Sequence, residues 1–463
     1  MEKKPGYTKN KKLKLYTRRN IDQIPQLAGL SKKFIASLNA VSEVLPFKVN
    51  NYVIDELIDW NNIPYDPIYQ LTFPQPGMLE PLDLNKIKSL LKKRASKAEI
   101  QKAAENIQMR LNPHPAEQLS LNVPVENGTI HTGMQHKYDE TVLFFPSQGQ
   151  SCHAFCTYCF RWAQFVGLDK LKFAGRDPEA LTTYLENHPE VTDILFTGGD
   201  PMTMGAGVFG KYLEPLIRKK PGNLSTIRIG TKALAYWPYR FVSDKDSDDL
   251  MGLFEKIVRN GIHLSVMAHF SHYRELETPI VQTAIQRILG TGAAIRCQAP
   301  LIKYINDDPH TWATMWKMQV KLGAVPYYMF VERDTGPKNY FKLPLKKACR
   351  IFSEAYSQVS GLCRTVRGPS MSATPGKVMV EGITEVRGEK FFALKFIQAR
   401  EPEWVNKIFF AEYDENASWL DELKPAFGER EFFFSRRLNE IKYKKANSRI
   451  KTDSALAPED ACS

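Results

Sequence analysis

The sequence predicts an α/β fold whose central part consists of six strand–helix units, preceded by a helical region and followed by a small extension. Three observations support this prediction. Between about residues 140 and 335, short apolar runs alternate with amphipathic segments. Polar insertions follow these apolar runs, and residues 20–125 repeat apolar side chains every three or four positions. A series of six such units indicates a parallel sheet, either open or closed into a barrel.

The helical region comes first in the chain. Residues 31–45 and 82–111 carry apolar side chains at helical spacing, and Ser31 is a suitable N-cap for the first of these segments. A proline-rich stretch at 64–82 separates them. We therefore expect residues 1–130 to form a helical region with a basic tail.

The strand–helix part is expected over residues 131–345. Its strands are 141–145, 193–199, 227–231, 263–270, 293–302 and 326–331, and the helices between them are 177–188, 210–220, 247–260, 278–290 and 310–323. In a parallel α/β arrangement, chemistry occurs at the carboxyl ends of the strands. Polar insertions follow the first four strands of this chain, so we expect the functional site at that edge.

The rest of the chain divides into two parts. Residues 346–400 contain a loop rich in Gly, Pro and Ser at 367–377 and a strand-like segment at 383–397. Residues 401–463 form a basic extension with a helical tail.

Composition and charge restrict the class of protein. Of 463 residues, 43% are hydrophobic and 25% are charged, which is typical of a globular chain. No apolar run of membrane-spanning length occurs, and the basic start lacks the apolar core of a secretory signal. The two ends supply much of the net charge of +12, and solvated tails explain it more simply than a nucleic-acid site. We therefore expect a cytoplasmic protein without membrane or nucleic-acid partners.

Three of the seven cysteines lie close together in the stretch SCHAFCTYCFRW at 151–162. Cys152, Cys156 and Cys159 have the spacing C-x3-C-x2-C, and an odd number of cysteines without a secretory signal argues against a disulfide framework. Zinc sites usually have four protein ligands, but no second cysteine pair is present and His153 is awkwardly placed to be a fourth ligand. Three thiolates suit a cubane iron–sulfur cluster with one iron open to a non-protein ligand. Ordinary zinc and a chance group of buried thiols are the alternatives.

This motif after the first strand, with Tyr158 just before the last cysteine, resembles the radical S-adenosylmethionine superfamily. The resemblance implies a [4Fe–4S] cluster whose open iron binds S-adenosylmethionine and whose electron generates a 5′-deoxyadenosyl radical. The segment TGGDP, with Gly198, Gly199 and Asp200, looks like the strand that meets the amino group of that cofactor. Glycine permits such an approach, although a tight turn would explain the same residues.

The resemblance extends to one family. The segments CFRW, FTGGDPM, IRIGTK, AHFSH, CQAPLIKYINDD, VPYYMF and PGKVMV occur in the order found in the lysine 2,3-aminomutase family, over roughly residues 20–400. This implies a partial (β/α)6 barrel of the radical S-adenosylmethionine type and pyridoxal phosphate as a further cofactor. It also implies an isomerase that moves the α-amino group of a free amino acid to the β-carbon.

Family roles carry over to five further residues. Lys377 falls where the family's lysine forms a Schiff base with pyridoxal phosphate, and Arg161 matches the arginine that binds the substrate carboxylate. Lys137 matches a basic residue near the pyridoxal phosphate group, and His269 and Gln298 match positions near S-adenosylmethionine. A satisfied polar residue at a strand end is the alternative for the last two.

The expected substrate pocket departs from the lysine-specific pattern. The family holds the distal ammonium of lysine with two aspartates, and the matching positions here are Ser370 and Arg333. A shift of one residue would bring Asp334 to the second position instead. An arginine against a lysine ammonium is unfavourable in a partly dry site. We therefore expect an acidic, glutamate-like substrate or a neutral one.

Other departures concern cofactor binding and assembly. An arginine expected near the pyridoxal phosphate group is Thr141 here, the loop at 146–151 is one residue longer, and Cys462 stands alone where the family has zinc-binding cysteines. The alternative function is therefore a radical enzyme of the same fold that modifies a protein or RNA residue without pyridoxal phosphate. Expected partners are a reductant such as flavodoxin or ferredoxin and a second copy of the chain.

Overall fold

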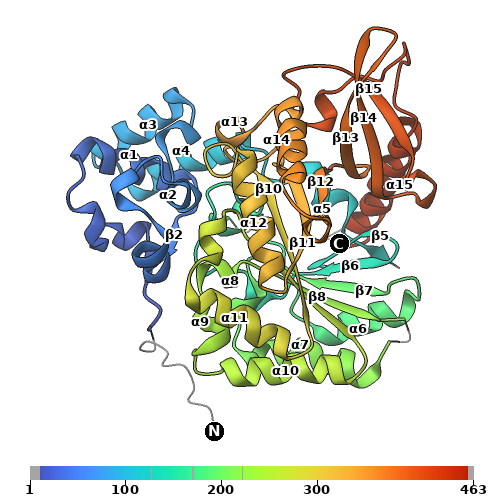
Figure 1. Cartoon of the computed structure of the whole chain (residues 1–463), viewed down its shortest axis with the longest axis horizontal. Helices are drawn as coiled ribbons and strands as arrows, with labels where there is room; N and C mark the ends of the chain where they lie inside the picture. The colour runs from blue at the N-terminus through green and yellow to red at the C-terminus, as the bar shows by residue number, and fades with distance from the viewer. Residues whose placement is uncertain (1–10, 127, 169–170, 222, 457–463) are drawn as a thin grey trace, which may run out of the picture.

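The computed structural model describes residues 11–126, 128–168, 171–221 and 223–456. The first ten residues of the basic tail and Cys462 lie outside these ranges. Figure 1 shows the N-terminal helices on one side of the parallel strands and the C-terminal strands with the last helix at another side. Among the described residues, no helix is both long enough and apolar enough to cross a bilayer.

One sheet of eleven strands organises the described chain, in the order β15-β14-β13-β12-β11-β10-β9-β8-β7-β6-β5. The strands are β5 (Met134–Tyr138), β6 (Thr141–Phe144), β7 (Asp193–Phe196), β8 (Thr226–Thr231), β9 (His263–His269), β10 (Ala294–Leu301), β11 (Val325–Val331), β12 (Arg367–Ser372), β13 (Gly376–Val386), β14 (Glu389–Ala399) and β15 (Ile408–Glu412). Strands β6 to β12 are parallel, and β5 and β13–β15 pair antiparallel at the two sides. The α/β class and the six expected strands, β6 to β11, are confirmed.

Helices follow each of these six strands. They are α6 (Pro178–Asn187), α7 (Ala206–Lys219), α8 (Ala233–Tyr236), α9 (Tyr239–Val242), α10 (Ser247–Arg259), α11 (Pro279–Gly290), α12 (Pro309–Lys321), α13 (Lys338–Phe341) and α14 (Leu345–Ser357). The five expected helices correspond to α6, α7, α10, α11 and α12. Because successive strands are parallel, their carboxyl ends and the loops that follow meet at one edge of the sheet.

The N-terminal region is helical, as expected, with two short strands. Its elements are β1 (Leu15–Thr17), α1 (Lys32–Val44), β2 (Lys48–Asn50), α2 (Pro67–Thr72), α3 (Pro81–Lys92), α4 (Lys97–Arg110), α5 (Gln118–Leu121), β3 (Val125–Glu126) and β4 (Thr129–Ile130). The Ser31 side chain accepts a hydrogen bond from Phe34 N and caps α1, as predicted. The segment 82–111 is two helices and not one, because Arg94 has a positive φ of 53° and Ser96 opens a new capping box.

The C-terminal part corrects one prediction. Residues 367–372, expected in a loop, form strand β12, which pairs in parallel with β11. The Gly, Pro and Ser composition permits this close pairing, since a Cβ at Gly368 would lie 2.5 Å from the carbonyl oxygen of Met329. Strand β15 pairs with β14, so the strands on both sides of residue 400 belong to one sheet. The basic tail contains helix α15 (Ser435–Leu456).

Candidate active site

The cysteine loop lies between β6 and α6, and the N-terminal region holds it from outside. Phe155 N donates to the carbonyl of Lys48 at 2.8 Å, and Thr157 N donates to the carbonyl of Leu71 at 3.0 Å. The buried Asn50 amide donates to the carbonyl of His153 at 3.1 Å. Backbone groups of the loop are therefore paired with β2 and α2, which fixes the loop without help from its cysteines.

The three thiols fit a cluster better than a single metal ion. Among the described residues, no three Cys, His, Asp or Glu side chains are gathered closely enough to hold one ion, as tetrahedral zinc would require. A cubane cluster instead takes each thiolate on a different iron. Burial raises the pKa of all three thiols, that of Cys159 to about 12, and neighbouring cysteines further raise the pKa of Cys152 and Cys159. The positive charge of iron is what would hold such thiols in the thiolate form.

The glycines of TGGDP allow one loop to pack on another. A Cβ at Gly198 would lie 2.2 Å from Nε2 of Gln150, and a Cβ at Gly199 would lie 2.4 Å from the backbone of Ser151. These glycines therefore seat the end of β7 against the cysteine loop. Their contact with the amino group of S-adenosylmethionine stays a prediction.

Asp200 joins the ends of β7 and β8. Its buried carboxylate accepts hydrogen bonds from the Thr231 hydroxyl at 2.7 Å and from the backbone N–H groups of Met202 and Lys232 at 2.9 Å. Burial raises the pKa of Asp200 to about 6. The geometry gives Asp200 a bracing function between the two loops that follow these strands.

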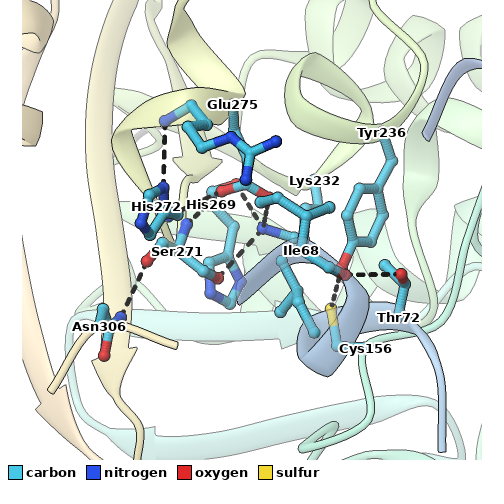
Figure 2. A network of polar contacts seen from close by, with 12 residues as sticks. Ile68, Thr72, Cys156, Lys232, Tyr236, His269, Ser271, His272, Glu275 and Asn306 are labelled. Atoms are coloured by element: carbon cyan, nitrogen blue, oxygen red, sulfur yellow. Dashed lines mark hydrogen bonds and ion pairs between the residues drawn. The ribbon is translucent and has the colours of Figure 1, made fainter. Parts of the chain in front are cut away.

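A buried polar network continues from there (Figure 2). The Lys232 ammonium lies 2.8 Å from the Glu275 carboxylate and 3.2 Å from the Ser271 hydroxyl. The Tyr158 hydroxyl bonds to the same Ser271 at 2.9 Å and to Nε2 of His269 at 2.8 Å. Burial lowers the pKa of His269 well below its ordinary value, so this imidazole is neutral near pH 7.

A cavity of about 260 Å³ opens at this edge of the sheet. Seven of the predicted site residues line it, and they come from different strands and loops: Lys137, Tyr158, Arg161, His269, Gln298, Arg333 and Lys377. Thr141 also lines it, and its hydroxyl donates to Asp193 at 3.3 Å. The expectation that these distant segments converge is therefore met, although their individual roles stay predictions.

Two arginines in the cavity lack a counter-charge among the residues that the structure describes. The guanidinium carbons of Arg161 and Arg333 lie 4.9 Å and 4.6 Å from the centroid of the Phe160 ring. Burial lowers the pKa of Arg161 to about 9 and that of Arg333 to about 10. Within the described ranges neither guanidinium has a carboxylate partner, so the cavity presents two dry cations to whatever enters it.

Two half-buried lysines also face this space. Lys377 donates to Oε1 of Gln398 at 2.9 Å, and its ammonium lies 4.2 Å from the centroid of the Tyr328 ring. Lys137 donates to the carbonyl of Ala373. Burial lowers the pKa of both lysines well below 10.5, and surrounding arginines lower it further. A buried lysine with a depressed pKa is a nucleophilic amine.

Other predicted residues lie elsewhere. Asp334 lines two neighbouring cavities, forms an ion pair with Lys338 and is not among the residues of the 260 Å³ cavity. Ser370 is fully buried in β12 and does not line this cavity either, whereas Ser372 does. The structure thus brings Arg333, and not its neighbour, to the site.

Sequence reasoning missed several lining residues. Glu332 is buried, both of its carboxyl oxygens lack a hydrogen-bond partner in the described part of the chain, and burial raises its pKa well above the ordinary value. Arg228 lines the cavity from β8 but is paired with Asp193 at 2.8 Å. The position of Glu332 directly after β11 was the signal that could have identified it, whereas Arg228, in the first half of β8, carries no such signal.

Several known proteins are similar to this chain. No family model matches the chain. A protein of Aquifex aeolicus named "Putative L-lysine 2,3-aminomutase" is 30% identical over 389 residues, which cover 83% of this chain and 89% of that one. The L-lysine 2,3-aminomutase of Bacillus subtilis is 26% identical over 229 residues, covering 50% of this chain and 45% of that one.

Solved structures give more distant likenesses. A radical SAM methyltransferase from Sphaerobacter thermophilus has a TM-score of 0.34 and 14% identity, covering 50% of this chain and 68% of that one. SuiB of Streptococcus suis, bound to the precursor peptide SuiA, has a TM-score of 0.34 and 11% identity, covering 59% and 60% of the two chains.

Proposed function

Because the chain belongs to the lysine 2,3-aminomutase family of radical S-adenosylmethionine enzymes, we propose that it is a pyridoxal-phosphate-dependent 2,3-aminomutase of a free amino acid. Membership implies a [4Fe–4S] cluster and S-adenosylmethionine. The rest of the proposal rests on the position of Lys377. Its half-buried amine faces the cavity that Tyr158 and His269 also line, and its pKa is lowered. The strand–helix units are proposed to curve into a partial (β/α)6 barrel around this cavity.

The cofactors supply the difficult chemistry: when bound, the cluster and S-adenosylmethionine provide a carbon radical, and the pyridoxal ring spreads the unpaired electron during the amino shift. The protein supplies binding and orientation. Cys152, Cys156 and Cys159 would hold the cluster, and Tyr158, His269 and Gln298 would contact S-adenosylmethionine.

Lys377 is suited to hold pyridoxal phosphate. Its nitrogen must be unprotonated to attack a carbonyl carbon, and burial among arginines favours that form. The amide of Gln398 fixes the nitrogen at 2.9 Å, and the ring of Tyr328 lies beneath it. Lys137 and Arg228 line the same cavity and would bind a phosphate. They would take the place of the family's arginine, which is Thr141 in this chain.

Arg161 and Arg333 support an acidic substrate. Arg161 is buried and Arg333 is half-buried, and neither has a carboxylate partner in the described ranges. An amino acid with two carboxylates would satisfy both. A lysine ammonium about 4 Å from Arg333 would cost about 4 kcal/mol at an effective dielectric of 20. We therefore propose a glutamate-like or neutral substrate and not lysine.

Borohydride reduction tests the role of Lys377. The wild-type protein is incubated with pyridoxal phosphate, reduced and digested, and the peptide that contains Lys377 is expected to carry the pyridoxyl group. The variant Lys377→Ala should lose this labelling and the Schiff-base absorption band. The exposed Lys390→Ala is the matched control and should keep both. Labelling confined to other lysines would overturn the proposal.

A second experiment separates the substrate classes. The reconstituted enzyme is incubated with S-adenosylmethionine and reductant, and 5′-deoxyadenosine is measured with glutamate or with lysine. Formation with glutamate supports the unpaired arginines as carboxylate ligands, and formation with lysine alone would contradict it. We propose a one-electron donor such as flavodoxin or ferredoxin as the natural reductant.

One observation favours the second candidate function. A cavity of about 530 Å³ lies between residues 112–117 and the C-terminal extension, and it shares Ala116 and Arg333 with the smaller cavity. A substrate larger than a free amino acid would fit into this larger cavity and reach the smaller one. A radical enzyme that modifies a protein or RNA residue would bind its substrate without pyridoxal phosphate. Absence of any pyridoxyl label after borohydride reduction would therefore favour this second function.

A further inference from the structure

Tyr236 stands beside one of the cluster cysteines. Its hydroxyl lies 3.2 Å from Sγ of Cys156, and Figure 2 shows the ring reaching from α8 toward the cysteine loop. The side chain is almost fully buried. The nearby hydroxyl of Thr72 donates instead to the carbonyl of Ile68 at 2.7 Å. Within the part of the chain that the structure describes, Cys156 is the hydrogen-bond partner of the Tyr236 hydroxyl.

The side chain of Asn50 bonds to both Tyr236 and the cysteine loop. The amide of Asn50 donates to the carbonyl of Tyr236 at 2.8 Å and to the carbonyl of His153 at 3.1 Å. Asn50 is fully buried in the N-terminal region. The buried Asn50 side chain therefore ties the backbone of Tyr236 to the backbone of the cysteine loop.

A cation lies over the tyrosine ring. The ammonium of Lys232 is 4.7 Å from the Tyr236 ring centroid and is held by Glu275 at 2.8 Å and by the carbonyl of His269 at 3.2 Å. A cation over an aromatic face is attracted by the electron density of the ring. It withdraws density from the phenol, so the O–H group becomes a stronger donor.

We propose that Tyr236 donates a hydrogen bond to the Cys156 thiolate and thereby raises the reduction potential of the cluster. A ligating thiolate has no proton, so the phenol is the donor. Reduction adds one electron, taken from an external one-electron reductant, and increases the negative charge on the cluster and its sulfurs. A hydrogen bond to a sulfur stabilises this reduced form more than the oxidised form. The proposal rests on the cluster alone and not on the aminomutase reaction.

Redox titration followed by electron paramagnetic resonance tests it. The Tyr236→Phe protein is reconstituted anaerobically and poised with dithionite and mediators, and its iron and sulfide contents are measured. The midpoint should move to a more negative potential, with about a fivefold lower ratio of reduced to oxidised cluster at a fixed potential, as expected for one hydrogen bond. Tyr52→Phe is the matched control, because it removes a buried hydroxyl that bonds Thr278 at 2.8 Å, away from the cysteines.

A second variant tests the proposal even if Tyr236→Phe does not assemble a cluster. Site-specific 3-fluorotyrosine at position 236 keeps the ring and the hydroxyl but makes the phenol a stronger donor, so the midpoint should move to a less negative potential. An unchanged midpoint in this protein, or equal shifts in Tyr236→Phe and Tyr52→Phe at full iron content, would overturn the proposal. Cleavage of S-adenosylmethionine is not needed for either readout.

Discussion

The cysteine loop and the cationic cavity meet at Tyr158 and Arg161, but they differ in how their polar groups are paired. The loop donates backbone hydrogen bonds to the carbonyls of Lys48 and Leu71 and accepts one from the Asn50 amide, and Gly199 packs directly on its backbone. In the cavity, Arg161 and Glu332 lie buried and Arg333 lies half-buried, all without ionic partners in the described ranges.

This difference separates two tasks. A loop whose backbone is already paired keeps one shape, whatever is bound to its thiols. A buried polar group without a partner costs about 1–3 kcal/mol, and such groups persist mainly where a ligand completes them. The cysteine loop is thus built to hold its geometry, while the cavity is completed by what it binds.

The largest expected effect comes from the loop. Cys156→Ser should abolish the cluster, because a serine hydroxyl does not replace a thiolate on iron. Iron and sulfide should fall to background, and S-adenosylmethionine cleavage should be lost. Far-ultraviolet circular dichroism should stay unchanged, since backbone hydrogen bonds hold the loop. The control Cys349→Ala, at a buried cysteine of α14, should keep its iron; loss of iron there would remove the distinction.

The next largest effect should come from the cavity, where one substitution should raise stability and lower ligand affinity. Arg333→Gln removes an unpaired half-buried cation, so the protein without ligand should gain about 1–3 kcal/mol in unfolding free energy. The same change should weaken binding of glutamate about 30-fold or more, since truncating one partner of a buried charge pair costs about 2 kcal/mol or more. Urea unfolding and calorimetric titration measure the two quantities. The exposed Arg430→Gln should change neither.

Sequence predicted the regular parts of this molecule and the loop better than the cavity. Six strands and the cysteine spacing are local patterns, so they could be read along the chain. Strand β12 could not, because glycine, proline and serine at 367–372 indicate a loop unless the pairing with β11 is known. The choice between Arg333 and Asp334 depends on which side chain faces inward at the end of β11, which the order of residues does not determine. Glu332 escaped notice because a glutamate beside an arginine resembles a surface ion pair.

A third effect tests the packing at the loop. Gly199→Ala places a Cβ 2.4 Å from the backbone of Ser151, so either β7 or the cysteine loop must move. We expect a loss of about 1–3 kcal/mol in unfolding free energy and a lower iron content after reconstitution. Gly207→Ala is the matched control in α7, where nothing lies within 4 Å of the added Cβ. It should gain about 0.5–1 kcal/mol from helix propensity. Equal effects of the two changes would show that the loop tolerates displacement.

The last effect concerns pH and the half-buried Lys377. Burial holds its pKa in the folded protein well below 10.5, so between that lowered pKa and pH 10.5 the unfolded chain binds more protons at this site than the folded chain. The stability of the wild type therefore rises with pH relative to Lys377→Met, by up to about 1.4 kcal/mol per pH unit, until pH 10.5 is reached. The variant should be the more stable protein at neutral pH, and its advantage should shrink at about pH 9.5. Urea unfolding without pyridoxal phosphate measures this, with the exposed Lys390→Met as control. A difference that does not change with pH would mean that Lys377 is solvated and charged, and the cavity would then lack the amine on which the proposed chemistry depends.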